Sequence, residues 1–128
     1  MKHPVWLERE DCLAIHDMML AQHGGLAGVR DEGLLESALS RPRNLVAYGT
    51  PTRQDLAARY AGGIIHNHPF LDGNKRTGFM LAVTFLELNQ FTFSATEESV
   101  VEKTLALASH SLTQTQYAEW LLENSVEL

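Results

Sequence analysis

The chain has 128 residues, of which 45% are apolar and 20% charged, the proportions of a globular domain with a substantial core. Its single cysteine, Cys12, excludes an intramolecular disulfide, is typical of a reducing compartment and is expected to serve packing. The sequence has no run of about 18 apolar residues and no secretion signal after Lys2, so it predicts no membrane span. We therefore expect one domain over residues 1–128, located in the cytoplasm.

The net charge of −6 is unevenly distributed along the chain. Residues 41–76 contain six lysines and arginines against two aspartates, whereas residues 77–128 contain one lysine against seven glutamates. The basic segment favours a small anionic ligand. The acidic segment is typical of a solvated helical surface and disfavours a nucleic-acid backbone, so we expect no direct contact with nucleic acid.

Helical patterns dominate the first half of the chain. A first helix is predicted from about Leu7 to His23, where two glycines stop it. A short second helix is predicted from about Glu32 to Leu39, because Arg41-Pro42 disfavours continuation. Residues 43–53 have no helical period and contain Gly49 and Pro51, so we expect a loop or a short hairpin there.

The second half is also predicted to be helical. A helix over about Gln54–Asn67 is ended by Pro69, and the next runs from about Asn74 to Leu88. The latter is apolar on nearly every side, which indicates a position in the middle of the domain. The predicted fold class is all-α, a compact bundle of about six helices around one buried central helix. The remaining predicted elements are an extended piece at 91–93, a helix from Thr96 to about Ser109 and a last helix after Thr113, with Gln116 in a capping box.

The run from His66 to Gly78 places several chemically active side chains just before the central helix. His68 is a candidate general base, since imidazole titrates near neutral pH. Asp72 supplies a hard oxygen ligand that suits magnesium held together with substrate phosphates. We expect the ring of Phe70, which lies between them, to anchor the loop in the core and to keep both residues in place.

The N-terminus of the central helix is a candidate anion site. Free N–H groups and the helix dipole attract negative charge at such an end, although a simple helix cap shows the same pattern. Gly73 lets a ligand approach the backbone, and Arg76 can bind phosphate oxygens in a bidentate manner. The pattern indicates that the protein binds a metal-bound polyphosphate and removes a proton beside it. The residues expected to bind phosphate are Gly73, Asn74, Lys75 and Arg76.

A zinc site is an alternative interpretation of the histidines. His66 and His68 could act as ligands, and His16-Asp17 is similar to the paired ligands of metal-dependent phosphohydrolases. An i, i+2 pair at a helix end points in divergent directions, however, and no cysteine or second carboxylate completes the set. The magnesium interpretation is therefore favoured.

The run from His68 to Arg76 resembles the signature of the Fic/Doc superfamily, His-Pro-Phe-x-Asp/Glu-Gly-Asn-Gly/Lys-Arg. Segments 24–31, 33–39 and 85–89 are similar to its death-on-curing branch, so the likeness covers nearly the whole chain. The resemblance implies an all-helical domain that transfers part of a nucleotide to a protein hydroxyl. It also implies that His68 is the general base, that Asp72 holds magnesium with ATP, and that residues 43–53 occupy the place of a target-docking flap.

Position 75 separates two reactions within this superfamily. Members that attach AMP usually have glycine there, whereas the death-on-curing toxin has lysine and phosphorylates a threonine of elongation factor Tu. Because this chain has Lys75, we expect a toxin of a type II toxin–antitoxin pair that transfers the γ-phosphate of ATP and blocks translation. Adenylyl transfer is the alternative, since Gly73 stands where the phage-type toxin has alanine. A non-catalytic regulatory module is a second alternative, although the motif is intact.

Self-inhibited members of the superfamily carry Ser/Thr-x-x-x-Glu-Gly/Asn. Glu123-Asn124 ends in this way, but Glu119 occupies the Ser/Thr position. We therefore expect restraint by a separate antitoxin. Spacing assigns no role to Arg30, Asp31 or Glu36.

Overall fold

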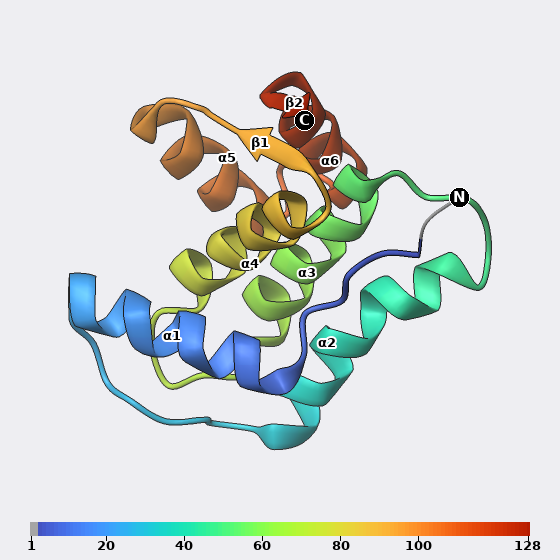
Figure 1. The fold of residues 1–128 in the computed structure, drawn as a ribbon. Coiled ribbons are helices and arrows are strands. Elements are labelled where there is room, and N and C mark those ends of the chain that lie inside the picture. Colours follow the sequence, from blue (N-terminus) through green and yellow to red (C-terminus); the bar gives the residue numbers. More distant parts are fainter. Residues whose placement is uncertain (1–2) are drawn as a thin grey trace.

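The computed structural model describes residues 3–128 as six helices and a two-stranded sheet (Figure 1). The predicted all-α class is thereby confirmed. Thr96 and Thr113 cap their helices through side-chain bonds to the N–H groups of Ser99 and Gln116, as the sequence predicted. The elements are α1 (Arg9–His23), α2 (Glu32–Val46), α3 (Arg53–Asn67), α4 (Asn74–Leu88), β1 (Phe91–Phe93), α5 (Glu97–Ala108), α6 (Gln114–Glu123) and β2 (Ser125–Glu127).

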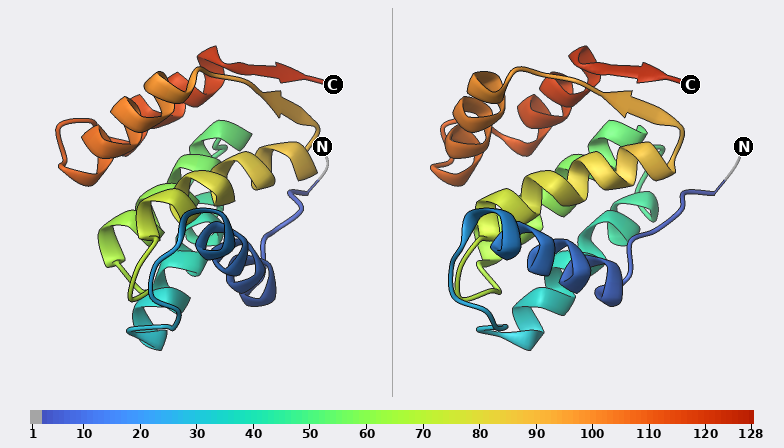
Figure 2. Two further views of the ribbon diagram at one scale, coloured as in Figure 1. Left: turned by 90° about the vertical axis from the view of Figure 1, so that its left-hand side faces the viewer. Right: turned by 60° about the vertical axis from the view of Figure 1, so that its left-hand side comes forward.

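Two helices form the centre of the bundle. α3 packs against α2, α4, α5 and α6, while α4 packs against α1, α3, α5 and β1. Figures 1 and 2 show α3 and α4 side by side, with α1 and α2 on one side of the pair and α5 and α6 on the other. Ten residues of α3 are buried, compared with seven of α4, so α3 shares the centre with the helix that the sequence placed there.

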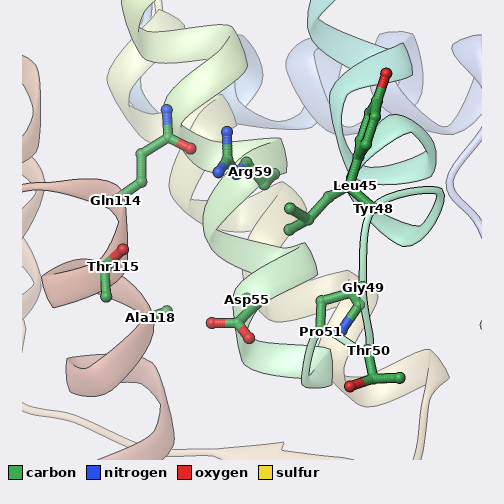
Figure 3. A pocket seen from close by; sticks show the side chains of 10 residues that line it. All are labelled: Leu45, Tyr48, Gly49, Thr50, Pro51, Asp55, Arg59, Gln114, Thr115 and Ala118. Atoms are coloured by element: carbon green, nitrogen blue, oxygen red, sulfur yellow. The ribbon is translucent and has the colours of Figure 1, made fainter.

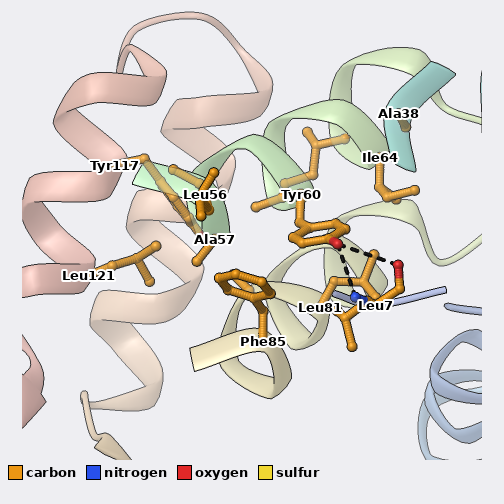
Figure 4. Packing of buried hydrophobic residues seen from close by; sticks show 14 of the residues in the cluster. Leu7, Ala38, Leu56, Ala57, Tyr60, Ile64, Leu81, Phe85, Tyr117 and Leu121 are labelled. Carbon is orange, nitrogen blue, oxygen red and sulfur yellow. Dashed lines mark hydrogen bonds between the residues drawn. The ribbon is translucent and has the colours of Figure 1, made fainter. Parts of the chain in front are cut away.

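The core between these helices is close-packed around aromatic rings (Figure 4). Tyr60 of α3 and Phe85 of α4 are fully buried, and their ring centroids lie 5.2 Å apart. Nearer the loop that joins the helices, a Cβ at Gly78 would lie 3.0 Å from the carbonyl oxygen of Ala61. Because glycine permits this approach, the first turns of α4 lie directly against the last turns of α3.

The buried thiol of Cys12 belongs to the same core. Its side chain is fully buried, and burial raises the pKa of the thiol to about 12. A thiol of this kind is poorly reactive at neutral pH, in keeping with the expected packing role. None of the helices in residues 3–128 combines the length and the apolar character that a membrane crossing requires.

The prediction that the second helix ends before Arg41 is wrong. α2 continues through Pro42 to Val46, and Pro42 is itself buried. Proline cannot donate to the carbonyl group four residues earlier, here that of Ala38. This carbonyl faces α3, where a Cβ at Gly63 would lie 3.0 Å from its oxygen. Tertiary packing against α3 therefore keeps the segment helical despite the missing bond.

The short sheet was only half predicted. The extended piece at 91–93 is confirmed as β1, but its partner β2 was not predicted. The two strands are antiparallel, with Thr92 opposite Val126. Since β2 has only three residues, its pattern carries no recognisable alternation.

The buried hydroxyl of Tyr60 provides a test of the core. It accepts a hydrogen bond from the N–H of Leu7 at 3.0 Å and lies 3.3 Å from the Leu7 carbonyl oxygen. Tyr60→Phe leaves both buried backbone groups without a partner, so we expect the free energy of unfolding to fall by about 1–2 kcal/mol. Urea denaturation measures the loss. Tyr48→Phe is the matched control, because the Tyr48 side chain is 88% exposed, and equal midpoints for the two variants would contradict the expectation.

Candidate active site

The motif residues lie on the loop that joins α3 to α4 and on the first turn of α4. His68 is the C-terminal cap of α3 and has φ 54° and ψ 52°, the left-handed conformation that is uncommon for residues other than glycine. Its side chain is exposed. The backbone at this position is therefore strained, and it depends on surrounding contacts to stay in place.

Arg30 holds the backbone of His68 from outside the loop. Its Nε donates to the His68 carbonyl oxygen at 2.7 Å, and its Nη2 donates to that of Asn67 at 3.0 Å. The N–H groups of Arg30 and Asp31 also donate to the carbonyl oxygen of Pro69, at 2.6 and 3.1 Å. A guanidinium at this end of α3 satisfies its last carbonyls and complements the helix dipole.

These contacts give Arg30 and Asp31 a structural role, that of holding the backbone of the motif loop, which spacing alone did not assign. Asp31 additionally caps α2, because its Oδ1 accepts a hydrogen bond from the N–H of Leu34 at 2.9 Å. Glu36 lies elsewhere, in a cleft with Arg9 and Arg43 that contains no motif residue.

Phe70 and Asn74 close the loop from within. The Phe70 ring is fully buried, and residue 70 forms an isolated bridge with Val29. The Asn74 side chain is also buried: its Oδ1 accepts from the Phe70 N–H and its Nδ2 donates to the Phe70 carbonyl, both at 3.0 Å. The side-chain amide of Asn74 is thus occupied by hydrogen bonds to Phe70, and only its main-chain N–H is open at the helix N-terminus.

The carboxylate of Asp72 is exposed and fixed in direction. Its Oδ1 accepts from the N–H of Gly73 at 3.0 Å, and its Oδ2 accepts from that of Leu26 at 3.2 Å. The backbone of Gly25 lies so close to this carboxylate that a Cβ at residue 25 would be 2.8 Å from Oδ2. Each oxygen keeps a further lone pair, so the group fits a hard divalent cation that is held jointly with phosphate oxygens.

The N-terminus of α4 is open to a ligand. Gly73 caps it with φ 77°, a conformation that suits glycine. Within residues 3–128 the main-chain N–H groups of Asn74, Lys75 and Arg76 donate to no protein acceptor. Lys75 and Arg76 are exposed, and neither forms an ion pair in the described part of the chain. Free N–H groups and two unpaired cations together make this helix end a candidate anion site.

His68 and Lys75 share one open groove. Its volume is about 640 Å³, and its opposite wall is the end of α5 and the turn that follows. The candidate base and a cation of the candidate anion site therefore face the same space. The remaining lining residues are Ile65, Leu105, Ala106, Ala108, Ser109 and Ser111.

A second cavity, of about 340 Å³, lies near the beginning of α3 (Figure 3). Residues 48–51, Arg59 and Gln114 line it, and it contains no motif residue. The connection between α2 and α3 spans only residues 47–52 and precedes α3, whereas His68 follows α3 about 20 Å away along the helix. The predicted loop is thus limited to residues 47–52, because 43–46 belong to α2, and its assignment to the place of a target-docking flap stays a prediction.

The zinc interpretation also disagrees with the geometry. The His66 Nε2 lies 2.8 Å from the carbonyl oxygen of Leu107, and its ring stacks on His110 at 4.2 Å. The His16 Nε2 lies 2.8 Å from the carbonyl oxygen of Asp72. Among residues 3–128 no three His, Cys, Asp or Glu side chains gather as metal ligands. Both histidines place Nε2 against a backbone oxygen, so that nitrogen is not available to a metal.

His16 is the residue of the site that sequence reasoning missed. The sequence pattern places it on the apolar face of the first helix and assigns it no part in the site, yet it is 3% exposed and lies under the loop. A buried imidazole needs a hydrogen-bond partner, and that requirement was the signal of a structural contact.

The fold and the site define an all-helical domain with a histidine, a carboxylate and an open helix N-terminus on one loop. The chain belongs to the Fic/DOC family, whose model matches residues 6–86. The resemblance to the death-on-curing branch is confirmed by two relatives. Toxin Doc of Mycolicibacterium smegmatis is 40% identical over 93 residues, 70% of this chain and 68% of that protein. Protein kinase doc of Escherichia phage P1 is 34% identical over 90 residues, 70% of this chain and 69% of that protein.

A solved structure supports the fold. The chain is similar to the N-terminal Fic domain of a Bartonella quintana cell filamentation protein with bound ADP, with a TM-score of 0.52 and 19% identity. The match covers 75% of this chain and 47% of that chain, so this protein corresponds to about half of the solved domain.

Removal of the Arg30 guanidinium should loosen the backbone of His68. We expect Arg30→Ala to speed amide hydrogen exchange at His68, whose N–H donates to the Ile64 carbonyl, and to lower the free energy of unfolding by about 1 kcal/mol. Exchange measured by NMR reports both effects. Arg59→Ala is the control, because that half-buried guanidinium makes no hydrogen bond or ion pair within residues 3–128. The same exchange rate in both variants would show that Arg30 does not hold the loop.

Proposed function

We propose that the protein is the toxin of a type II toxin–antitoxin pair and transfers the γ-phosphate of ATP to a hydroxyl of a protein target. The observation that carries this proposal is the shared groove of His68 and Lys75 at the open N-terminus of α4, with the Asp72 carboxylate fixed on the same loop. The kinase named among the relatives and the ADP bound to the similar fold both support it.

Each residue of the site would have a separate role in this reaction. The target hydroxyl enters the groove, and His68 takes its proton as the oxygen attacks the γ-phosphorus. The bond between the γ-phosphorus and the β–γ bridging oxygen breaks, and ADP leaves with that oxygen. The main-chain N–H groups at the start of α4 and the side chains of Lys75 and Arg76 would hold the phosphates. Asp72 would hold magnesium, which neutralises phosphate charge when bound.

Asn74 would contribute to this pocket in a restricted way. Because its side chain is bonded to Phe70, only its main-chain N–H can bind phosphate. Gly73 would contribute space, since its own N–H is bonded to the Asp72 carboxylate. Phe70 would act as the anchor of the loop, in agreement with its complete burial.

The target and the partner belong to the same proposal. We infer that the modified protein is elongation factor Tu, on a threonine, because the motif with Lys75 resembles that of the toxin with this activity. The separate antitoxin would restrain the site in place of an internal segment. In residues 3–128 no carboxylate pairs with Arg76, so the cation is free for such a partner or for phosphate.

Adenylyl transfer is the second candidate, and Gly73 is the observation that favours it. A glycine at the helix start leaves room for a diphosphate to approach the backbone. The exposed Lys75 side chain in the same groove favours the opposite orientation of ATP, with the γ-phosphate next to the base. A third candidate, a regulatory module without catalysis, has no observation in its favour, since every side chain of the motif is retained.

Labelled ATP distinguishes the two reactions. With purified elongation factor Tu and magnesium, we expect transfer of label from the γ position only and a mass increase of about 80 Da, not the increase of about 329 Da that AMP would give. We expect His68→Ala to slow transfer by about 10²- to 10⁴-fold, as loss of a general base does. His23→Ala, an exposed histidine on α1, is the matched control. Label from the α position alone would overturn the kinase proposal.

Lys75 provides a second test of the chemistry. Lys75→Gly removes a cation from the groove that it shares with His68, so we expect phosphoryl transfer to fall by at least about tenfold, the effect of one charge-assisted hydrogen bond. Any remaining modification should shift toward AMP, which intact-mass measurement detects. Lys103→Ala removes a lysine from α5 outside the groove and should leave the rate unchanged. An unchanged rate in Lys75→Gly would remove Lys75 from the phosphate site.

Toxicity in cells tests the binding-module alternative. Expression of the parent protein should arrest growth, whereas His68→Ala should be tolerated. If the two proteins are equally harmless, the non-catalytic alternative replaces the kinase proposal.

A further inference from the structure

His16 of α1 lies directly beneath the loop of the candidate site. Its side chain is 3% exposed, and its ring is stacked on that of Phe70, with centroids 3.8 Å apart and planes within 8°. Its Nε2 lies 2.8 Å from the main-chain oxygen of Asp72. Because a carbonyl oxygen can only accept, Nε2 carries the proton and donates it to Asp72.

This hydrogen bond acts on the residue that presents the carboxylate. The Asp72 main chain is held from the core side by His16, and its side chain is held by the N–H groups of Leu26 and Gly73. The imidazole also lies near the next residue, because a Cβ added at Gly73 would be 3.7 Å from its Nε2. One side chain of α1 thus contacts Phe70 and Asp72 and lies beside Gly73, the cap of α4.

We propose that His16 is a positioning residue whose Nε2–H bond to Asp72 sets the direction of the carboxylate, and thereby the affinity of the site for a nucleotide-bound divalent cation. This inference rests on the proposed function, in which Asp72 is the magnesium ligand. His16 itself touches neither substrate nor cation. Groups that orient a metal ligand in this way typically change metal affinity by about 10- to 100-fold when removed.

Packing alone does not account for this residue. A phenylalanine would stack on Phe70 as well as an imidazole does, and without the cost of burying polar atoms. The Nε2–H donor of His16 therefore has a role separate from the packing of its ring. Substitutions can separate the effect of the ring from that of the hydrogen-bond donor. His16→Phe keeps an aromatic ring and removes the donor. His16→Gln keeps a donor at similar reach and removes the ring.

A matched control is present in the same molecule. His66 also places Nε2 at 2.8 Å from a backbone oxygen, that of Leu107, and also stacks on a ring, that of His110. His66→Phe removes a bond of the same kind at a place that does not contact Asp72. It reports what the loss of such a bond does to stability in general.

The first measurement uses the protein without nucleotide. Amide hydrogen exchange by NMR is followed at Gly73 and Leu26, whose N–H groups bind the Asp72 carboxylate. We expect exchange at both positions to be several-fold faster in His16→Phe, and unchanged in His16→Gln and His66→Phe. Unchanged exchange in His16→Phe would overturn the proposal.

The second measurement is the affinity for ADP, by calorimetry, with and without magnesium. We expect the gain in affinity that magnesium gives to fall by about tenfold in His16→Phe, while the magnesium-free affinity stays near that of the parent. His16→Gln and His66→Phe should keep the gain. Equal losses with and without magnesium would mean that His16 is only structural, and would overturn the proposal.

Two further outcomes are informative. If His16→Phe does not fold, His16→Gln decides, because loss of the magnesium-dependent gain in a variant that keeps the donor would contradict the proposal. If the parent itself binds ADP without any effect of magnesium, the proposed role of Asp72 fails. The exchange measurement would still show whether His16 holds Asp72, so the two failures can be told apart.

Discussion

The candidate site depends on a set of hydrogen bonds from α1 and the α1–α2 connection to the loop between α3 and α4. The loop has one internal clamp, the Asn74 side chain on Phe70, and it contains a strained residue, His68, in the left-handed conformation. A loop of this kind keeps its shape only if its surroundings hold it. The groups that do so belong to His16, Leu26, Gly28, Arg30 and Asp31.

The bundle places this loop against a firm support. α3 and α4 approach each other closely near Ala61 and Gly78, so the end of one helix packs directly on the start of the next. The base follows the first helix, and the open N–H groups begin the second. A site on the ends of packed helices is held more accurately than one on a free loop. The geometry therefore suits a reaction that needs a proton acceptor and a phosphate at a set separation.

Electrostatics explain why the site would attract a polyphosphate. Lys75 and Arg76 lie side by side at the positive end of the α4 dipole, and in residues 3–128 neither is paired with a carboxylate. Such an arrangement is unfavourable without an anion and favourable with one. Membership of the Fic/DOC family and the relatives named as Doc toxin and doc kinase agree with this view.

Local signals in the sequence determined most of the helices and the motif itself. Helix caps such as those of Thr96 and Thr113 join residues only three apart, so a short pattern shows them. The motif is likewise continuous in sequence, from His68 to Arg76. For these features, neighbouring residues carry all the information.

Only the tertiary structure decided what holds the motif in place. Arg30 and His68 are 38 residues apart, and His16 and Asp72 are 56 apart, distances over which no periodic pattern reports a contact. The continuation of α2 through Pro42 and the remote position of residues 47–52 likewise follow from packing on α3. The sequence by itself determined which groups are present, because they are adjacent along the chain. Their direction required the folded chain, because the hydrogen bonds that orient them come from α1 and the α1–α2 connection, which are distant along the chain.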